Sequence, residues 1–346
     1  MKKSLALILA MLMMLSVLTG CGGNDGKTDG PSDAGSSKTD APATDSGTPA
    51  PEDDLKWPER DITLTVGYAA GGDCDVATRY LAEELSKELG VNVVVTNMKG
   101  SNAALACEEV YNTNDPEYNF LVLNTASLSA NVATGVYDKS YKDFDTISLF
   151  SSYSGETLYV PADAPYDTFE EFVAYAKENP VVMGVTMGGS LYAAGCAMNA
   201  QGLKLEFIDA GDGVDRLISM LGGNLDCTFA SYSSARDYIE NGDFKELATL
   251  CSSPIAAAPD LPCVCDTLPG VIINTKFVMM TQPGVDEAIR KKMNDVMQHI
   301  YETNPDYVQK VEDYTFQSAK PMTIEESLNE LEIQYQTFQD YKQFLS

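Results

Sequence analysis

Short apolar segments alternate with amphipathic helical segments from Trp57 onward, and this alternation constrains the fold more than any other feature of the chain. The segments 62–66, 91–97 and 119–124 are rich in β-branched and aliphatic residues, which is typical of strands. Apolar residues recur every four positions over 77–89 and the pattern stops at Gly90, which predicts a helix. Because strands joined by helices usually pair in parallel, we expect a mostly parallel sheet covered on both faces.

The middle of the chain repeats this alternation. Further strands are expected over 158–160, 183–186, 205–208, 226–230 and 247–250. A capping box formed by Thr168 and Glu171 predicts the start of one helix in this segment. An apolar stripe predicts the buried face of a later helix, at Val214, Leu217, Ile218 and Leu221. The middle segment should therefore form an α/β unit of its own.

The C-terminal segment is predicted to be mostly helical, with an apolar stripe over 289–300 and a second capping box at Thr323 and Glu326. We expect these helices to pack on the first sheet. Residues 57–155 and 276–346 would then form a first lobe, and residues 156–275 a second. Ligands bind beyond the carboxyl ends of strands in such sheets, so two facing lobes would form a ligand cleft. The expected fold class is α/β with two lobes.

The N-terminus has the pattern of an exported protein. Residues 1–20 combine two lysines with an apolar run too short to suggest a spanning helix, and they end before Cys21. This order resembles a bacterial lipoprotein signal peptide, with Cys21 as the acylated residue; an ordinary secretory signal is the alternative. Residues 21–56 are rich in Gly, Ser, Thr, Asp, Ala and Pro, which predicts a disordered tether. We expect an extracytoplasmic protein anchored to the cell membrane by a lipid.

Charge and motifs exclude several classes of function. A formal net charge of −28 disfavours binding to nucleic acid. The only histidine, His299, falls in a predicted helix, and neither a Ser-His nor a Cys-His arrangement is in evidence. Glycine loops with Rossmann or Walker spacing are absent from the sequence. We therefore expect no enzyme activity and no cofactor.

Seven cysteines follow Cys21, an odd number that argues against a complete disulfide framework. Cys263 and Cys265 are spaced like a metal or redox pair, but the second pair or nearby histidine of a zinc site is missing. We expect free, mostly buried thiols and no metal.

The turn after the first strand, 67–76, is the strongest candidate binding element. Gly71 and Gly72 allow close approach of the backbone and positive φ, and the start of a helix leaves N–H groups without partners. Such a turn suits a small carboxylate. Asp75 either caps the helix or receives a ligand ammonium or hydroxyl.

Small polar residues follow three other predicted strands, in both lobes. Each group alone is consistent with a plain turn, but their recurrence favours a binding site. The candidate residues are Thr125 and Ser127 after the third strand, Gly188, Gly189 and Ser190 in the middle segment, and Ser231 and Ser233 after residue 230.

The sequence from Trp57 to Gly90 resembles the N-terminus of the substrate-binding proteins of tripartite tricarboxylate transporters, the TctC/Bug group. That group typically opens with Trp-Pro, a strand and a glycine loop. The places of that loop are filled here by Tyr68, Ala70, Gly71, Gly72 and Asp75. Asn97 and Gly100 match its second loop, and the segments MGGS (187–190) and LISMLGGNLDCTFAS (217–231) match its middle-lobe pattern. The resemblance covers roughly residues 57–346.

This resemblance implies a type II periplasmic-binding-protein fold and a receptor that delivers its ligand to membrane permease subunits. It also implies that main-chain N–H groups hold a small carboxylate. The segment DAGDG (209–213) departs from the family pattern, which has a Tyr-Lys-Gly-like stretch there. Asp209 and Asp212 in place of that lysine argue against a tricarboxylate and favour a mono- or dicarboxylate or an amino acid. A sensory lipoprotein acting with a signalling partner is an alternative that the sequence leaves open.

Overall fold

The structure is a computed structural model that describes residues 55–152 and 155–345. The expected signal peptide, the expected lipidation site Cys21 and nearly all of the expected tether lie outside these residues. None of the helices in the described ranges is long and apolar enough to cross a membrane.

The first lobe is built on a five-stranded sheet with the order β2-β1-β3-β10-β4. Its strands are β1 (Ile62–Val66), β2 (Val93–Asn97), β3 (Asn119–Asn124), β4 (Asp145–Ser152) and β10 (Lys276–Thr281). β1 pairs in parallel with β2 and β3, whereas β10 is antiparallel to both of its neighbours. Helices of this lobe are α1 (Asp73–Leu89), α2 (Ala104–Tyr111), α9 (Glu287–Thr303) and α10 (Pro305–Thr315).

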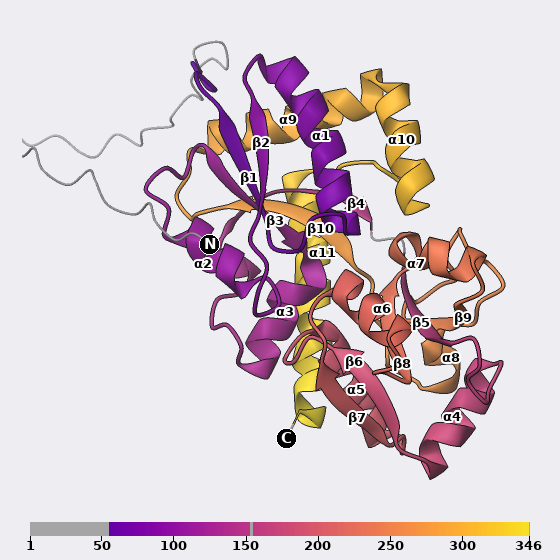
Figure 1. The fold of residues 1–346 in the computed structure, drawn as a ribbon. Coiled ribbons are helices and arrows are strands. Elements are labelled where there is room, and N and C mark those ends of the chain that lie inside the picture. Colours follow the sequence, from indigo (N-terminus) through magenta and orange to yellow (C-terminus); the bar gives the residue numbers. More distant parts are fainter. Residues whose placement is uncertain (1–54, 153–154, 346) are drawn as a thin grey trace, which may run out of the picture. The chain divides into compact units, whose positions relative to one another are not determined.

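The second lobe has a five-stranded sheet of the same design, with the order β7-β6-β8-β5-β9. Its strands are β5 (Glu156–Pro161), β6 (Val181–Val185), β7 (Leu205–Asp209), β8 (Cys227–Ser231) and β9 (Phe244–Thr249). Its helices are α4 (Phe169–Glu178), α5 (Ser190–Ala200), α6 (Gly213–Leu221), α7 (Tyr232–Glu240) and the short α8 (Val264–Thr267). β5 lies antiparallel to β8 and β9. Both sheets are thus mixed, with one reversed strand each, β10 in the first and β5 in the second (Figure 1). The other four strands of each sheet run in the same direction, in line with the expected mostly parallel sheets.

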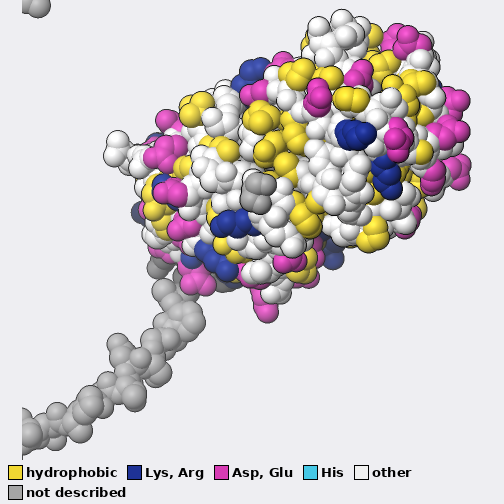
Figure 2. Space-filling model, turned by 90° about the horizontal axis from the view of Figure 1, so that it is seen from below, with side chains coloured by type: hydrophobic (Ala, Val, Ile, Leu, Met, Phe, Trp, Pro, Cys, Tyr) yellow, Lys and Arg dark blue, Asp and Glu magenta, His cyan; other side chains and the backbone are white. Residues whose placement is uncertain are grey.

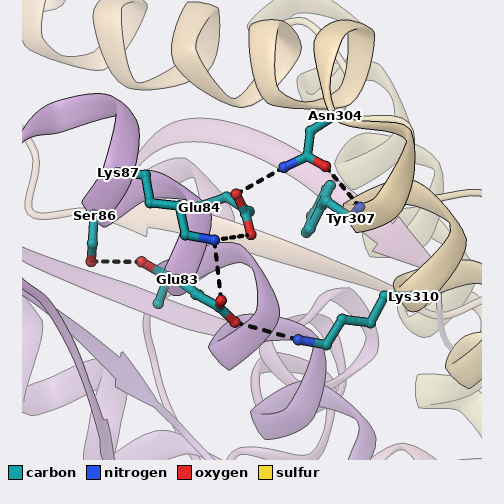
Figure 3. A network of polar contacts seen from close by, with 8 residues as sticks. Glu83, Glu84, Ser86, Lys87, Asn304, Tyr307 and Lys310 are labelled. Atoms are coloured by element: carbon teal, nitrogen blue, oxygen red, sulfur yellow. Dashed lines mark hydrogen bonds and ion pairs between the residues drawn. The ribbon is translucent and has the colours of Figure 1, made fainter.

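The C-terminal helices divide between the lobes. α9 and α10 pack on the first lobe as expected, burying Ile289, Met293 and Tyr307 in its core. Polar contacts reinforce this packing: Asn304 Nδ2 donates to Glu84 of α1 at 2.8 Å, and Lys310 pairs with Glu83 at 3.3 Å (Figure 3). Because such surface ion pairs contribute little, the apolar contacts carry most of the attachment.

Helix α11 (Ile324–Tyr341) does not confine itself to the first lobe, contrary to expectation. Its Leu331 packs in a first-lobe cluster, whereas Phe338 and Tyr341 belong to the core of the second lobe. The Tyr341 hydroxyl also accepts from the Ile272 N–H at 2.6 Å. Helix α3 (Thr125–Thr134) likewise contributes small residues to the second-lobe core, so these two helices connect the lobes (Figure 1).

The buried face of α6 differs from the predicted stripe. Leu217 is buried with Met220, whereas Ile218 and Leu221 are more than half exposed. The inward face also contains Arg216, which is only 5% exposed. This helix of nine residues packs against β8, β5 and β6 through a narrow inner face, so its buried face is narrower than the apolar stripe of the sequence predicted.

All seven cysteines of the described residues are free, as expected. Burial raises the pKa of the Cys107 thiol to about 12, which makes this thiol a poor nucleophile. On the face seen in Figure 2, acidic side chains are spread over the surface with a few Lys and Arg side chains among them, rather than gathered into one patch.

Candidate functional site

A cavity of about 580 Å³ lies between the lobes, where strands of both sheets end. Its first-lobe wall comes from the turn after β1, the loop 99–103 and Asn124 at the end of β3. Its second-lobe wall comes from segments 186–191 and 209–216, which follow β6 and β7. This volume is typical of small-molecule sites, and the position is where open α/β sheets bind ligands.

The turn after β1 forms the first wall in a different way from the one expected. α1 begins at Asp73 and its N-cap is Gly72, which has extended backbone with φ −79°. Positive φ is needed only at Gly71, with φ +87°. A side chain at Gly72 would have open space, since its Cβ would meet only the Ala69 carbonyl oxygen, at 3.7 Å. Gly72 therefore keeps the cavity wall open rather than relieving backbone strain.

Asp75 has a structural role within this turn. It lies in the first turn of α1, not at the N-cap, and its Oδ2 accepts from the Gly71 N–H at 2.9 Å and from Arg79 Nε at 3.0 Å. Its Oδ1 accepts from Asn97 Nδ2 at 2.9 Å. Burial raises the pKa of Asp75, but the hydrogen bonds from Arg79, Gly71 and Asn97 outweigh it, and the net pKa lies below the ordinary value. The Gly71 N–H is thus already used within the protein.

Asp73, at the start of α1, joins the two lobes beside the cavity. It is 3% exposed, and its Oδ1 accepts from hydroxyls of the second lobe at 2.5–3.0 Å. The donors are Ser231, Ser233 and Ser234, at the end of β8 and in the first turn of α7. Two of the predicted ligand-binding serines therefore hold the lobes together through Asp73.

A second group of contacts crosses the cavity. The Ala69 N–H of the first lobe donates to Asp212 Oδ2 at 3.0 Å, and Lys99 pairs with Asp215 at 3.0 Å. Asp212 Oδ1 is buried and accepts no hydrogen bond from the described residues. Burial raises the pKa of Asp212, and the neighbouring Asp215 carboxylate adds to this effect, although the Ala69 N–H and Lys99 oppose it.

Tyr68 belongs to a hydrogen-bonded network in the first-lobe wall. Its hydroxyl donates to Ser127 Oγ at 2.6 Å and accepts from the Asn124 N–H at 3.2 Å. Ser127 Oγ in turn donates to Asn102 Oδ1 at 3.0 Å, and Asn102 Nδ2 donates to Asn131 Oδ1 at 2.9 Å. Burial raises the pKa of Tyr68 well above its usual value, so the phenol stays protonated. The network fixes the wall in one arrangement.

Arg216 is the buried cation of the second-lobe wall. Its Nη1 donates to the Gly211 carbonyl at 2.8 Å and to Thr186 Oγ1 at 3.1 Å, and its Nη2 donates to the Phe229 carbonyl at 3.2 Å. Its Nε is buried without an acceptor. In the described residues the ion pairs of 4.0 Å or less are formed by other bases, and none joins a carboxylate to the Arg216 guanidinium.

Comparison with known proteins agrees with this architecture. The model of the tripartite tricarboxylate transporter family receptor, TctC, matches residues 77–342. The chain belongs to this family. The UPF0065 protein in the gbd 5′ region of Cupriavidus necator is 29% identical over 244 residues, which cover 69% of this chain and 74% of that relative.

Two solved structures share the fold of this receptor. The periplasmic binding protein BugD has a TM-score of 0.73 at 21% identity, with 83% of this chain and 98% of that chain covered. MatC from Rhodopseudomonas palustris, solved with bound malate, has a TM-score of 0.72 at 18% identity, with 84% of this chain and 100% of that chain covered. The two-lobe fold expected from the sequence is thereby confirmed, as is membership of a family of non-enzymatic extracytoplasmic solute receptors.

The receptor brings only part of the predicted site to the cavity. Of the predicted residues, those that line the cavity are Tyr68, Gly72, Ser190 and Asp212. The other predicted residues lie outside the lining: Ala70, Gly71, Asp75, Thr125, Ser127, Gly188, Gly189, Ser231 and Ser233. Several of these support the walls: Thr125 Oγ1 accepts from the Lys276 N–H at 3.2 Å, and the Gly188 carbonyl accepts from Thr134 Oγ1 at 2.6 Å.

Sequence reasoning missed Arg216, Asp73 and Asn102 as cavity residues of the receptor. Arg216 carried a detectable signal, because it lies between apolar positions of a helix that follows a strand end. The sequence gives no comparable sign that Asn102 lines the cavity, because its position depends on a loop with positive φ at residues 101–103.

Proposed function

We propose that this receptor is anchored outside the cytoplasm by a lipid on Cys21, binds a small organic carboxylate or an amino acid between its lobes, and delivers it to membrane permease subunits. The length of the segment 21–56 supports the anchoring, since a coil of this size reaches roughly 30–35 Å and would hold the lobes clear of a membrane. Malate bound to the structural neighbour MatC supports the ligand class.

The observation that carries the ligand class is the buried Arg216 guanidinium. An arginine stays charged at every physiological pH, and a buried charge without a counter-charge is costly. Neutral carbonyl and hydroxyl oxygens satisfy its Nη groups but do not neutralise it. A ligand carboxylate in the adjacent cavity would supply the missing negative charge.

The position of Arg216 within α6 strengthens this argument. The arginine lies in the first turn of the helix, where the macrodipole is positive and a cation is disfavoured. The N-cap residue, Asp212, makes no side-chain capping hydrogen bond. The wall thus combines a guanidinium with the positive end of a helix, and both attract an anion.

Calorimetry of wild type, Arg216→Met and Arg216→Lys with small carboxylates and amino acids tests the proposal. A charge-assisted hydrogen bond contributes about 1.5–3 kcal/mol, so Arg216→Met should weaken binding roughly 10- to 150-fold. Arg216→Lys keeps the charge and should lose less. Lys177→Met is the matched control, because this base is exposed on α4, outside the cavity lining.

Circular dichroism and thermal unfolding establish that each variant is folded. Loss of affinity in Arg216→Met with retention in Lys177→Met supports the proposal. Binding of carboxylates by folded Arg216→Met at wild-type affinity would contradict it, as would the failure of every acid in the panel to bind the wild type.

A further inference from the structure

The cavity has an acidic lining, which is unusual for a site that receives an acid. Its bases are Lys99 and Arg216, and its acids are Asp73, Glu156, Asp209, Asp212 and Asp215. With every group in its ordinary charge state the lining is net negative. A di- or tricarboxylate entering it would be repelled, whereas a ligand that also carries a positive charge would not.

Asp212 is the acid in this lining whose surroundings call for a proton donor. The Ala69 N–H satisfies Oδ2, but Oδ1 is buried without a hydrogen-bond donor among the described residues. Lys99, across the cavity, lies within 4.0 Å of Asp215 and not of Asp212. An acceptor buried in this way destabilises the folded protein, and more so when it is charged, until a donor reaches it.

Arg216 supplies the complementary half of the site from the same segment. The Arg216 N–H donates to the Asp212 carbonyl at 3.0 Å, so the two residues are one helical turn apart. Their side chains nevertheless form no ion pair within 4.0 Å in the part of the chain that the structure describes. The wall therefore presents an anion and a cation, both adjacent to the cavity and neither neutralised by the other.

We propose that the ligand is a zwitterion, whose protonated nitrogen binds Asp212 while its carboxylate compensates Arg216. This inference rests on the proposed function and narrows it to an amino acid or a related amino-carboxylate. The ligand ammonium gives the buried Oδ1 its missing donor and reduces the repulsion between Asp212 and Asp215. Binding of the zwitterion adds no net charge to an acidic cavity.

Matched ligand pairs that differ only by the amino group test this assignment. Calorimetry at neutral pH would compare L-alanine with propionate, L-aspartate with succinate, L-glutamate with glutarate, and L-leucine with 4-methylpentanoate. We expect the amino member of the best-binding pair to bind wild type at least tenfold more tightly. Asp212→Asn keeps an acceptor for the Ala69 N–H but removes the charge, so this preference should fall below threefold.

Asp260→Asn is the matched control, since it removes an equal charge from an exposed position of the second lobe outside the cavity lining. It should keep most of the preference for the amino member, and the thermal unfolding of both variants checks that they fold.

The outcomes separate the two proposals. If wild type binds both members of a pair equally, or if folded Asp212→Asn keeps the tenfold preference, the zwitterion assignment is wrong while carboxylate binding stands. If neither member of any pair binds wild type, the proposed function itself fails.

Discussion

Replacing Asp73 by alanine should loosen the attachment of the two lobes. One carboxylate oxygen accepts hydroxyl hydrogen bonds from Ser231, Ser233 and Ser234 of the opposite lobe. A hydrogen bond to a charged group contributes about 1.5–3 kcal/mol net. The released hydroxyls can partly pair again, since Ser231 Oγ already contacts Ser234 Oγ at 2.7 Å. We therefore expect a loss of about 2–4 kcal/mol in the free energy of unfolding, less than the sum of three such bonds.

Urea unfolding measures this loss with two probes. Far-ultraviolet circular dichroism follows both lobes, while fluorescence of Trp57, the only tryptophan, follows the core of the first lobe. With a slope of roughly 3 kcal/mol per molar urea, the midpoint should fall by about 1 M. Asp260→Ala, at an exposed position, is the control and should shift the midpoint by less than about 0.2 M. A shift in Asp73→Ala no larger than that of the control would refute this role of the hydroxyl contacts.

Two further predictions concern acid stability and anchoring. Because hydrogen bonds lower the pKa of Asp75 in the folded state, its contribution to stability is present above about pH 4 and is lost as the pH falls through the folded pKa. The free energy of unfolding of Asp75→Asn should therefore lie below that of wild type at pH 5, and the difference should shrink as the pH falls to about 2, as measured by denaturant titrations. A difference that does not change with pH would count against the assignment. Cys21→Ser should move the receptor from the membrane fraction to the soluble fraction of the cell and abolish incorporation of labelled fatty acid, and unchanged membrane association would argue for an anchor elsewhere in the chain.

The alternation of strands and helices was readable from the sequence because it depends on local residue patterns. The predicted segments at 62–66, 119–124 and 205–208 coincide with strands of the structure. β4 and β10 were not predicted. Their apolar runs lack a distinctive period, and β10 becomes a strand only by pairing with β3 and β4, more than 120 residues earlier in the chain.

The candidate site was harder to predict because it is assembled by contacts between distant residues. The glycine turn and Asp212 were both selected from the sequence, but their meeting through the Ala69 N–H joins positions 143 residues apart. Local reasoning assigned the N–H of Gly71 to a ligand, whereas Asp75 accepts it within the turn. Arg216 was not selected because a lone arginine in a helix is usually solvated, and its place between apolar positions was the one sign in the sequence that it is buried.

Hydrogen–deuterium exchange of the purified receptor, with and without the tightest-binding acid from the matched pairs, tests the location of ligand binding most directly. The central claim is that a small acid binds between the walls formed by residues 67–74 and 209–216. We expect amide exchange to slow at least tenfold in both segments when the acid is bound. Slowing confined to one segment or to another part of the chain, in a sample shown by calorimetry to be saturated, would contradict the claim.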